Sequence, residues 1–77
     1  MDADWILLTL RDAAVALDEL IEDIEDDPDV AQTLLNDQMA ALYAKLNFAW
    51  NSRHSGPAAI DTIDHDVLVS WPQDLVL

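Results

Sequence analysis

The chain has 77 residues and a net charge of −13, from sixteen Asp and Glu against three Lys and Arg, yet 52% of its residues are hydrophobic. So many apolar residues exclude a disordered acidic tail. The charge excludes direct binding to nucleic acid, because Lys and Arg are the residues that bind phosphates. Cysteine is absent, which excludes disulfides and thiolate chemistry.

The length predicts one small domain over residues 1–77, whose single core would be only marginally stable without association. No run approaches the roughly 20 apolar residues of a membrane span. The first residues, Met1 to Asp4, lack the positive charge of a signal peptide. We therefore expect a soluble, cytoplasmic protein with no membrane contact.

The first predicted helix covers residues 4–25. Its apolar positions are Ile6, Leu10, Ala13, Leu17, Leu20 and Ile24. Their spacing of three and four is the period of a helix with one buried face. Asp2 or Asp4 is expected to cap the first turn by accepting hydrogen bonds from its free amides. Pro28 restricts the residue before it, so the helix should end near Glu25.

The second predicted helix covers residues 28–53, with Asp27 as its N-cap and Pro28 in its first turn. Its apolar stripe consists of Leu35, Met39, Leu42, Leu46 and Ala49. Gly56 and Pro57 supply the stop signal. A connection this short predicts an all-α antiparallel helical hairpin. In this register Trp5 should lie beside Trp50, and Arg11 near Lys45.

The remaining residues, 57–77, form a tail with a weaker pattern. Val67, Val69 and Trp71 alternate as in a strand. Ser70 and Gln73 fit a capping box, which would make Trp71 to Leu77 one short helical turn. We expect an extended or short-helical tail that folds back over the open end of the hairpin. The polar residues Asn47, Asn51 and Arg53 would bond this tail or contact a partner. Alternatively, they are only polar positions on an exposed stripe, with Arg53 complementing the helix dipole.

Half of the acidic residues lie close to the connection between the helices. They are Asp18, Glu19, Glu22, Asp23, Glu25, Asp26, Asp27 and Asp29, and are named the acidic tip below. Two interpretations remain open. The acidic tip binds a basic surface, or it is a solvated charge run that keeps the protein soluble, including in high salt.

Both predicted helices carry more apolar surface than one partner helix can cover. Leu8 and Val15 lie beside the main stripe of the first helix, and Tyr43 and Trp50 beside that of the second. The favoured interpretation is a homodimer of hairpins that forms a four-helix bundle. The alternatives are a groove on another protein and a tail that covers the excess.

Candidate catalytic and metal-binding residues are few. The cluster of possible ligands consists of Asp61, Asp64, His65 and Asp66. Neither a helix nor a strand would bring three of them together, and capping of turns explains them equally well. Ser52 and His54 lack an orienting carboxylate, and a chain whose only glycine is Gly56 has no phosphate loop. We predict no metal, no cofactor and no enzymatic activity.

These observations favour a small acidic interaction protein, either an inhibitor or antitoxin-like regulator or a nucleic-acid mimic. It would bind a basic protein surface through the acidic tip, while Trp71 and Leu75 anchor in an apolar groove. The alternative is a structural or scaffold subunit of a homo-oligomer or a larger complex, in which the acidic residues serve only solubility.

Overall fold

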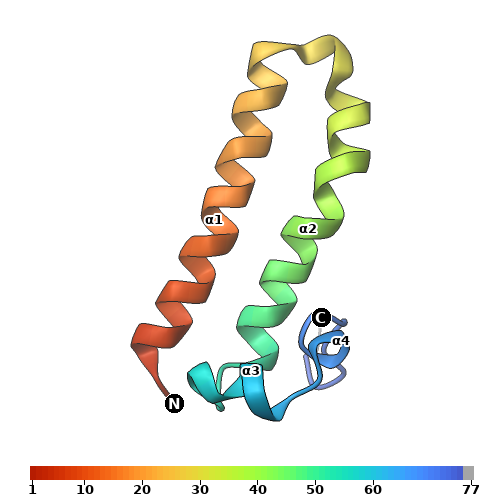
Figure 1. The fold of residues 1–77 in the computed structure, drawn as a ribbon. Coiled ribbons are helices and arrows are strands. Elements are labelled where there is room, and N and C mark those ends of the chain that lie inside the picture. Colours follow the sequence, from red (N-terminus) through yellow and green to blue (C-terminus); the bar gives the residue numbers. More distant parts are fainter. Residues whose placement is uncertain (76–77) are drawn as a thin grey trace.

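Two long antiparallel helices form the body of the protein (Figure 1). The computed structural model describes residues 1–75. Helix α1 spans Ala3–Asp26, helix α2 spans Ala31–Asn51, and the 3-10 helix η1, Pro28–Val30, connects them. The molecule measures 42 × 25 × 23 Å. The predicted all-α antiparallel hairpin is confirmed.

Helix α1 begins where its cap was expected. Asp2 has extended backbone angles, and its Oδ1 accepts hydrogen bonds from the amides of Asp4 at 3.0 Å and Trp5 at 3.2 Å. Asp2 is therefore the N-cap, and Asp4 lies in the first turn. At the other end Asp27 leaves the helical region, with φ −146° and ψ 84°, because Pro28 follows it. The predicted bounds of 4–25 are correct to within one residue.

The second helix differs from the prediction at both ends. Residues 28–30 form the separate 3-10 turn η1, and the side chain of Asp27 makes no capping hydrogen bond. Its carbonyl oxygen accepts from the amide of Val30 instead, at 3.2 Å. Helix α2 then ends at Asn51, two residues before the predicted end. The turn closes at Gly56, whose φ of +63° is a conformation that glycine adopts without strain.

The face of α1 that packs on α2 agrees only in part with the predicted one. Ala13 and Leu20 are buried as expected, but Leu10 and Leu17 are 44% and 43% exposed, and Thr9 is buried in addition. Thr9 can be buried because its hydroxyl donates to the carbonyl of Ile6, at 3.0 Å. On α2 the prediction was right for Leu42 and Ala49, which are buried, and wrong for Met39 and Leu46, which are 42% and 46% exposed. The pattern predicted the helices but not which flank of each faces inward.

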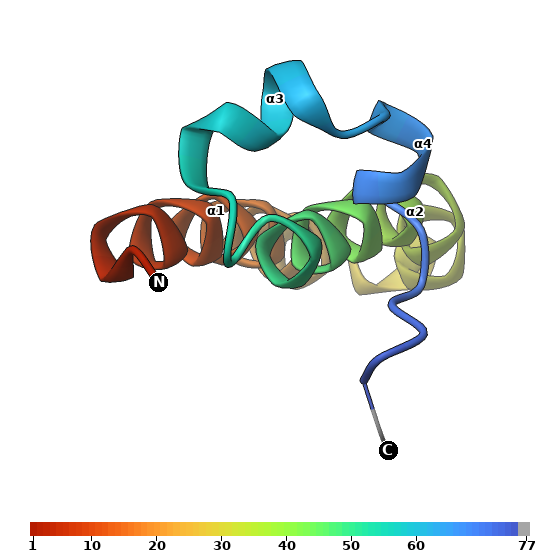
Figure 2. The same ribbon diagram turned by 90° about the horizontal axis from the view of Figure 1, so that it is seen from below.

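The tail contains short helices rather than a strand. The 3-10 helix η2 (Gly56–Ala58), α3 (Ala59–Thr62) and α4 (His65–Leu68) lie on one face of the hairpin (Figure 2). No strand occurs among residues 1–75. Val67 belongs to α4 because the Asp64 carboxylate caps this helix, accepting from the amide of Asp66 at 2.9 Å. The strand interpretation is therefore wrong.

The alternative prediction of a short helix in the tail was right, but the helices lie at residues 56–68. Residues 71–75, where the helical turn was predicted, are not helical. Ser70 does not cap a turn there, since its hydroxyl donates back to the carbonyl of Val67 at 2.8 Å. The rest of the predicted segment, residues 76–77, lies outside the described residues. After α4 the chain passes the edge of α2 to the side of the hairpin opposite α3 (Figure 2).

Two asparagines of α2 hold this tail in place. The side-chain amide of Asn47, a buried residue, donates to the carbonyl of Val69 at 3.0 Å. That of Asn51 lies 2.8–3.1 Å from the carbonyls of Val67, Leu68 and Ser70. These bonds satisfy carbonyls left free at the end of a four-residue helix, and they let Leu68, 2% exposed, pack beneath.

Candidate interaction surfaces

The acidic tip occupies the closed end of the hairpin, where α1 meets η1 (Figure 1). All eight of its residues are exposed. Among the described residues, the acidic tip's side chains take part in one hydrogen bond to another side chain, in which Gln38 Nε2 donates to Asp23 Oδ2 at 3.0 Å. No Lys, Arg or His of residues 1–75 makes an ion pair with them. The acidic tip is therefore a concentrated and uncompensated negative charge.

The basic residues lie toward the other end of the molecule. Lys45 Nζ is 2.8 Å from Asp12 Oδ2, and Arg53 Nη2 is 2.7 Å from Asp74 Oδ2. Arg11 is exposed and, within residues 1–75, makes no ion pair. Lys45 thus pairs with Asp12, the residue that follows Arg11 in sequence, which agrees with the predicted level of Lys45 and Arg11 in the hairpin.

The C-terminal segment 71–75 lies along α2. The ring of Trp71 stacks on Tyr43, with centroids 5.7 Å apart and an interplanar angle of 18°. Trp71 remains 43% exposed, and Leu75 is partly buried. The two predicted anchor residues are therefore docked on their own hairpin. Helix α2 separates η1 from Tyr43 by roughly 20 Å, at 1.5 Å per residue. The acidic tip and the docked pair Trp71 and Leu75 are therefore two separate surfaces.

Asp74 fixes this segment to the end of α2. Its Oδ1 accepts from the indole N–H of Trp50 at 2.8 Å, and its Oδ2 from Arg53 at 2.7 Å. These hydrogen bonds, the one from Trp50 first, hold the pKa of Asp74 below its usual value. The Arg53 guanidinium also lies 3.9 Å above the Trp50 ring, a cation–π contact. Trp50 therefore points to the tail and not to Trp5.

Trp5 packs at the open end against α2 and the start of the tail. Its ring centroid is 6.1 Å from that of Phe48, and its indole N–H donates to Ser52 Oγ at 2.9 Å. Ser52 is fully buried and donates to the carbonyl of Phe48 at 2.7 Å. The expected Trp5–Trp50 pair is replaced by this contact. Ser52 is a structural hydroxyl, enclosed between two helices.

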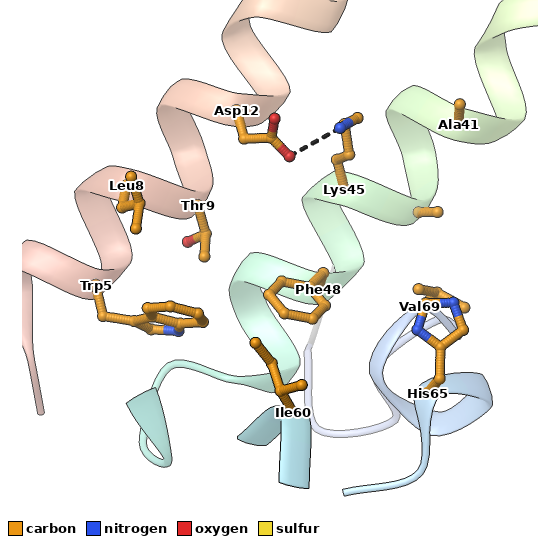
Figure 3. A pocket seen from close by; sticks show the side chains of 11 residues that line it. Trp5, Leu8, Thr9, Asp12, Ala41, Lys45, Phe48, Ile60, His65 and Val69 are labelled. Atoms are coloured by element: carbon orange, nitrogen blue, oxygen red, sulfur yellow. Dashed lines mark hydrogen bonds and ion pairs between the residues drawn. The ribbon is translucent and has the colours of Figure 1, made fainter. Parts of the chain in front are cut away.

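Two apolar clefts flank the hairpin, one toward α3 and α4 and one on the opposite side. The first, of about 570 Å³, is lined by Trp5, Leu8, Phe48 and Ile60, with the Asp12–Lys45 pair at one end and His65 at the other (Figure 3). The second, of about 580 Å³, is lined by Leu10, Tyr43 and Leu46 and by the segment 71–75. Volumes of this order suit apolar side chains of a partner.

The candidate ligand cluster of the tail does not converge. Asp64 caps α4, and Thr62 donates to the carbonyl of Ala58 at 2.8 Å. Among the residues that the structure describes, no three His, Cys, Asp or Glu side chains are placed to hold a metal ion. Of the cluster, Asp64 thus caps a turn, and His65 forms part of the rim of the first cleft.

The sequence did not reveal the Asp74–Trp50–Arg53 contact or the two clefts, because both depend on the path of the tail. A partial signal was present in Asn47 and Asn51, polar residues within an apolar segment, which bond the tail as one of the interpretations predicted. No protein-family model, curated protein or solved structure matches this chain. Within residues 1–75, no helix combines the length and apolar character needed to cross a membrane.

Proposed function

We propose that the chain is a small, non-enzymatic interaction protein that binds a basic surface of another protein through its acidic tip. The observation that carries the proposal is the separation of charge. Eight exposed carboxylates share one end of the molecule, while Lys45 and Arg53 are paired with other carboxylates toward the opposite end. A field of this kind attracts a positively charged partner and raises its rate of association.

The arrangement suits an inhibitor, an antitoxin-like regulator or a mimic of nucleic acid. Most of the acidic tip belongs to the last turns of the 24-residue helix α1, so the carboxylates project from a regular backbone, as phosphates do from a duplex. A basic groove that binds phosphates would accept them through the same Lys and Arg side chains. Once the complex has formed, Trp71 and Leu75 supply apolar contact that slows dissociation.

The test compares two double variants with the same change in net charge. Glu22→Lys with Asp26→Lys reverses charge within the acidic tip, and Asp61→Lys with Asp66→Lys does so in the tail. Each is immobilised beside the wild type, exposed to cell lysate and eluted with rising salt. We expect a basic protein that the wild type and the tail variant retain at low salt and the tip variant loses.

The association rate of that protein, measured by stopped flow, should fall steeply for the tip variant at low salt and converge with the wild type at high salt. Equal rates for both double variants at low salt would refute a binding role, and the acidic tip would then serve only solubility.

A second candidate function, a structural or scaffold subunit, is favoured by the small core. Six hydrophobic residues are buried among the described residues, and three of these are alanines. Many large apolar side chains remain more than 40% exposed, Leu7, Leu8 and Val15 among them. Pairing of two hairpins into a four-helix bundle would cover such faces. A subunit of this kind should gain mass with concentration and persist in high salt.

A further inference from the structure

Helix α1 carries a second apolar stripe, separate from the face that packs on α2. It consists of Leu7, Leu10, Ala14, Leu17 and Ile21. The four large residues are 43–46% exposed, and Ala14 is exposed as well. The spacing of three and four along the stripe is the heptad pattern by which two helices pack side by side. This stripe is the outer stripe of α1.

The outer stripe belongs to the face of the hairpin that lies away from α3. Leu10 lines the second cleft together with Tyr43 and Leu46, and Met39 continues this apolar flank along α2 at helical spacing. Among the described residues, the segment that reaches this side is the C-terminal one, which lies along α2 (Figure 2). Beyond the cleft at Leu10, no segment of residues 1–75 is placed over the α1 half of the face, and the stripe contains no charged residue in a chain of net charge −13.

One edge of the outer stripe carries charges of opposite sign. Arg11 directly follows Leu10 and Asp18 directly follows Leu17, so both occupy the same edge, seven positions apart. Two turns of a helix bring such residues to the same side. Both are exposed, and neither makes an ion pair with another residue of 1–75. Asp4 and Glu25 continue this edge at the same spacing of seven. The edge therefore carries one cation, Arg11, among three anions, and a reversed copy of the helix can bring Arg11 level with Asp18.

We propose that the outer stripe packs against the outer stripe of a second copy, antiparallel, so that Arg11 of each subunit pairs with Asp18 of the partner subunit. This proposal rests on the self-association put forward above and needs no basic partner, although it shares Asp18 with the acidic tip. In this register Leu10 lies opposite the partner's Ile21, and Ala14 opposite the partner's Leu17. Small and large side chains thus meet at the centre, as close helix packing requires.

Charge selects the antiparallel orientation. A parallel dimer would place two acidic tips side by side and align Arg11 with the partner's Arg11. The antiparallel dimer places the acidic tips at opposite ends of a hairpin 42 Å long, far beyond the Debye length of about 8 Å at physiological ionic strength. The same register brings Glu25 toward the partner's Asp4, so Glu25→Lys should tighten the dimer.

The test is a charge-reversal cycle, with the dimer dissociation constant measured by sedimentation equilibrium. Arg11→Asp and Asp18→Arg should each weaken the dimer roughly tenfold or more, because like charges then face each other twice. The double variant should return to within about threefold of the wild type. Glu19→Arg has the same charge change as Asp18→Arg but projects about 100° away around the helix, and it should leave the dissociation constant nearly unchanged.

A second pair of variants tests the apolar contact. Ala14→Glu places a charge at the centre of the outer stripe, whereas Val15→Glu places it on the neighbouring flank, where Val15 is 57% exposed. Both sites are exposed, so the monomer should fold in either case, as circular dichroism would show. We expect Ala14→Glu to be monomeric and Val15→Glu to remain dimeric.

The possible failures are distinct. A wild type that is monomeric at all concentrations overturns both self-association and this interface. A dimer that ignores the charge reversals, or that is broken by Val15→Glu and not by Ala14→Glu, overturns the interface and leaves self-association standing. A foreign helix bound to the outer stripe would show as mass gained only when another protein is added, and it too would overturn the proposal. Asp18 and Glu19 also belong to the acidic tip, so binding of a basic partner is judged separately, from Glu22→Lys with Asp26→Lys, whose residues are not part of the proposed Arg11–Asp18 pair.

Discussion

Asp74 shows how single polar side chains determine the path of the tail. Its carboxylate joins the indole of Trp50 to the guanidinium of Arg53, and Arg53 in turn donates to the carbonyl of Trp50 at 2.7 Å. Each of these groups has a partner, and none of the buried side-chain N and O atoms in the described part of the chain is unsatisfied. The segment 71–75 is therefore held by hydrogen bonds as much as by the stacking of Trp71.

Removal of the Asp74 charge should release this segment at neutral pH. The folded-state pKa of Asp74 is lowered by hydrogen bonds from Trp50 and Arg53, so its contribution to docking is present above the unfolded-state pKa and lost as pH falls through the folded value. We expect Asp74→Asn to shift the Trp50 indole N–H resonance at pH 7. The difference from the wild type should persist at the ordinary aspartate pKa of ~3.9 and vanish only in stronger acid, once pH has fallen through the lowered folded-state pKa of Asp74.

Asp61→Asn is the control, because Asp61 is exposed and lies on α3, away from Trp50. It should leave the indole resonance in place at every pH. An unchanged Trp50 signal in Asp74→Asn would show that stacking of Trp71 on Tyr43 alone positions the segment.

Contacts of single residues differ in how well the sequence predicts them. The cap at Asp2 was predictable because it depends on residues two and three positions away. The contact between Trp50 and Asp74 joins residues 24 positions apart, and the local pattern holds no information on it. Asn51 lies between these cases, since a polar residue in an apolar segment indicates a partner without identifying it.

At the scale of elements, the crossing of α1 and α2 depends on small residues. Ala13 is 2% exposed and Ala49 is 5% exposed, so these positions admit no larger side chain without moving the helices apart. The amphipathic pattern favoured Leu10 and Leu17 as inward residues because it weighs hydrophobicity and not size. Close packing selected the neighbouring face, on which Thr9 satisfies its own hydroxyl within the helix.

Ala13→Leu should therefore destabilise the protein although it adds apolar surface. Overpacking of a filled interface costs about 1–3 kcal/mol. Ala40→Leu is the matched control, because Ala40 is exposed on α2 and the same side chain there extends into solvent. Urea unfolding followed by circular dichroism, at one protein concentration, would measure both. A loss of stability no larger for Ala13→Leu than for Ala40→Leu would mean that this face of α1 is not the packed one.

At the scale of the whole molecule, the excess of apolar surface was predictable, and its distribution was not. The helical pattern indicated more apolar surface on the two helices than one hairpin can bury. The structure divides them between two faces, because η2, α3 and α4 lie over one side and leave the outer stripe of α1 on the other. Which side the short helices cover depends on the left-handed turn at Gly56 and on the bonds to Asn47 and Asn51, which no periodicity encodes.

The large negative net charge of the molecule should lower the stability of its folded state. The described residues form two salt bridges, neither of which involves the acidic tip, whereas the net charge is −13. Repulsion among the carboxylates should therefore outweigh attraction at low ionic strength. Adding salt from about 0.01 M to 1 M shortens the Debye length from about 30 Å to about 3 Å. We expect the thermal midpoint to rise over this range, measured by circular dichroism at fixed protein concentration.

The acidic tip should be the main source of this salt effect. Glu22→Gln with Asp26→Asn removes two of its charges and should reduce the rise in midpoint. Asp61→Asn with Asp66→Asn removes the same charge from the tail, where the carboxylates are fewer, and should retain most of it. A midpoint that falls with salt would instead mean that the Asp12–Lys45 and Asp74–Arg53 pairs dominate the electrostatics. If salt raises the midpoints of both double variants by the same reduced amount, the repulsion is spread over the whole surface. The acidic tip would then contribute no more repulsion than the rest of the chain.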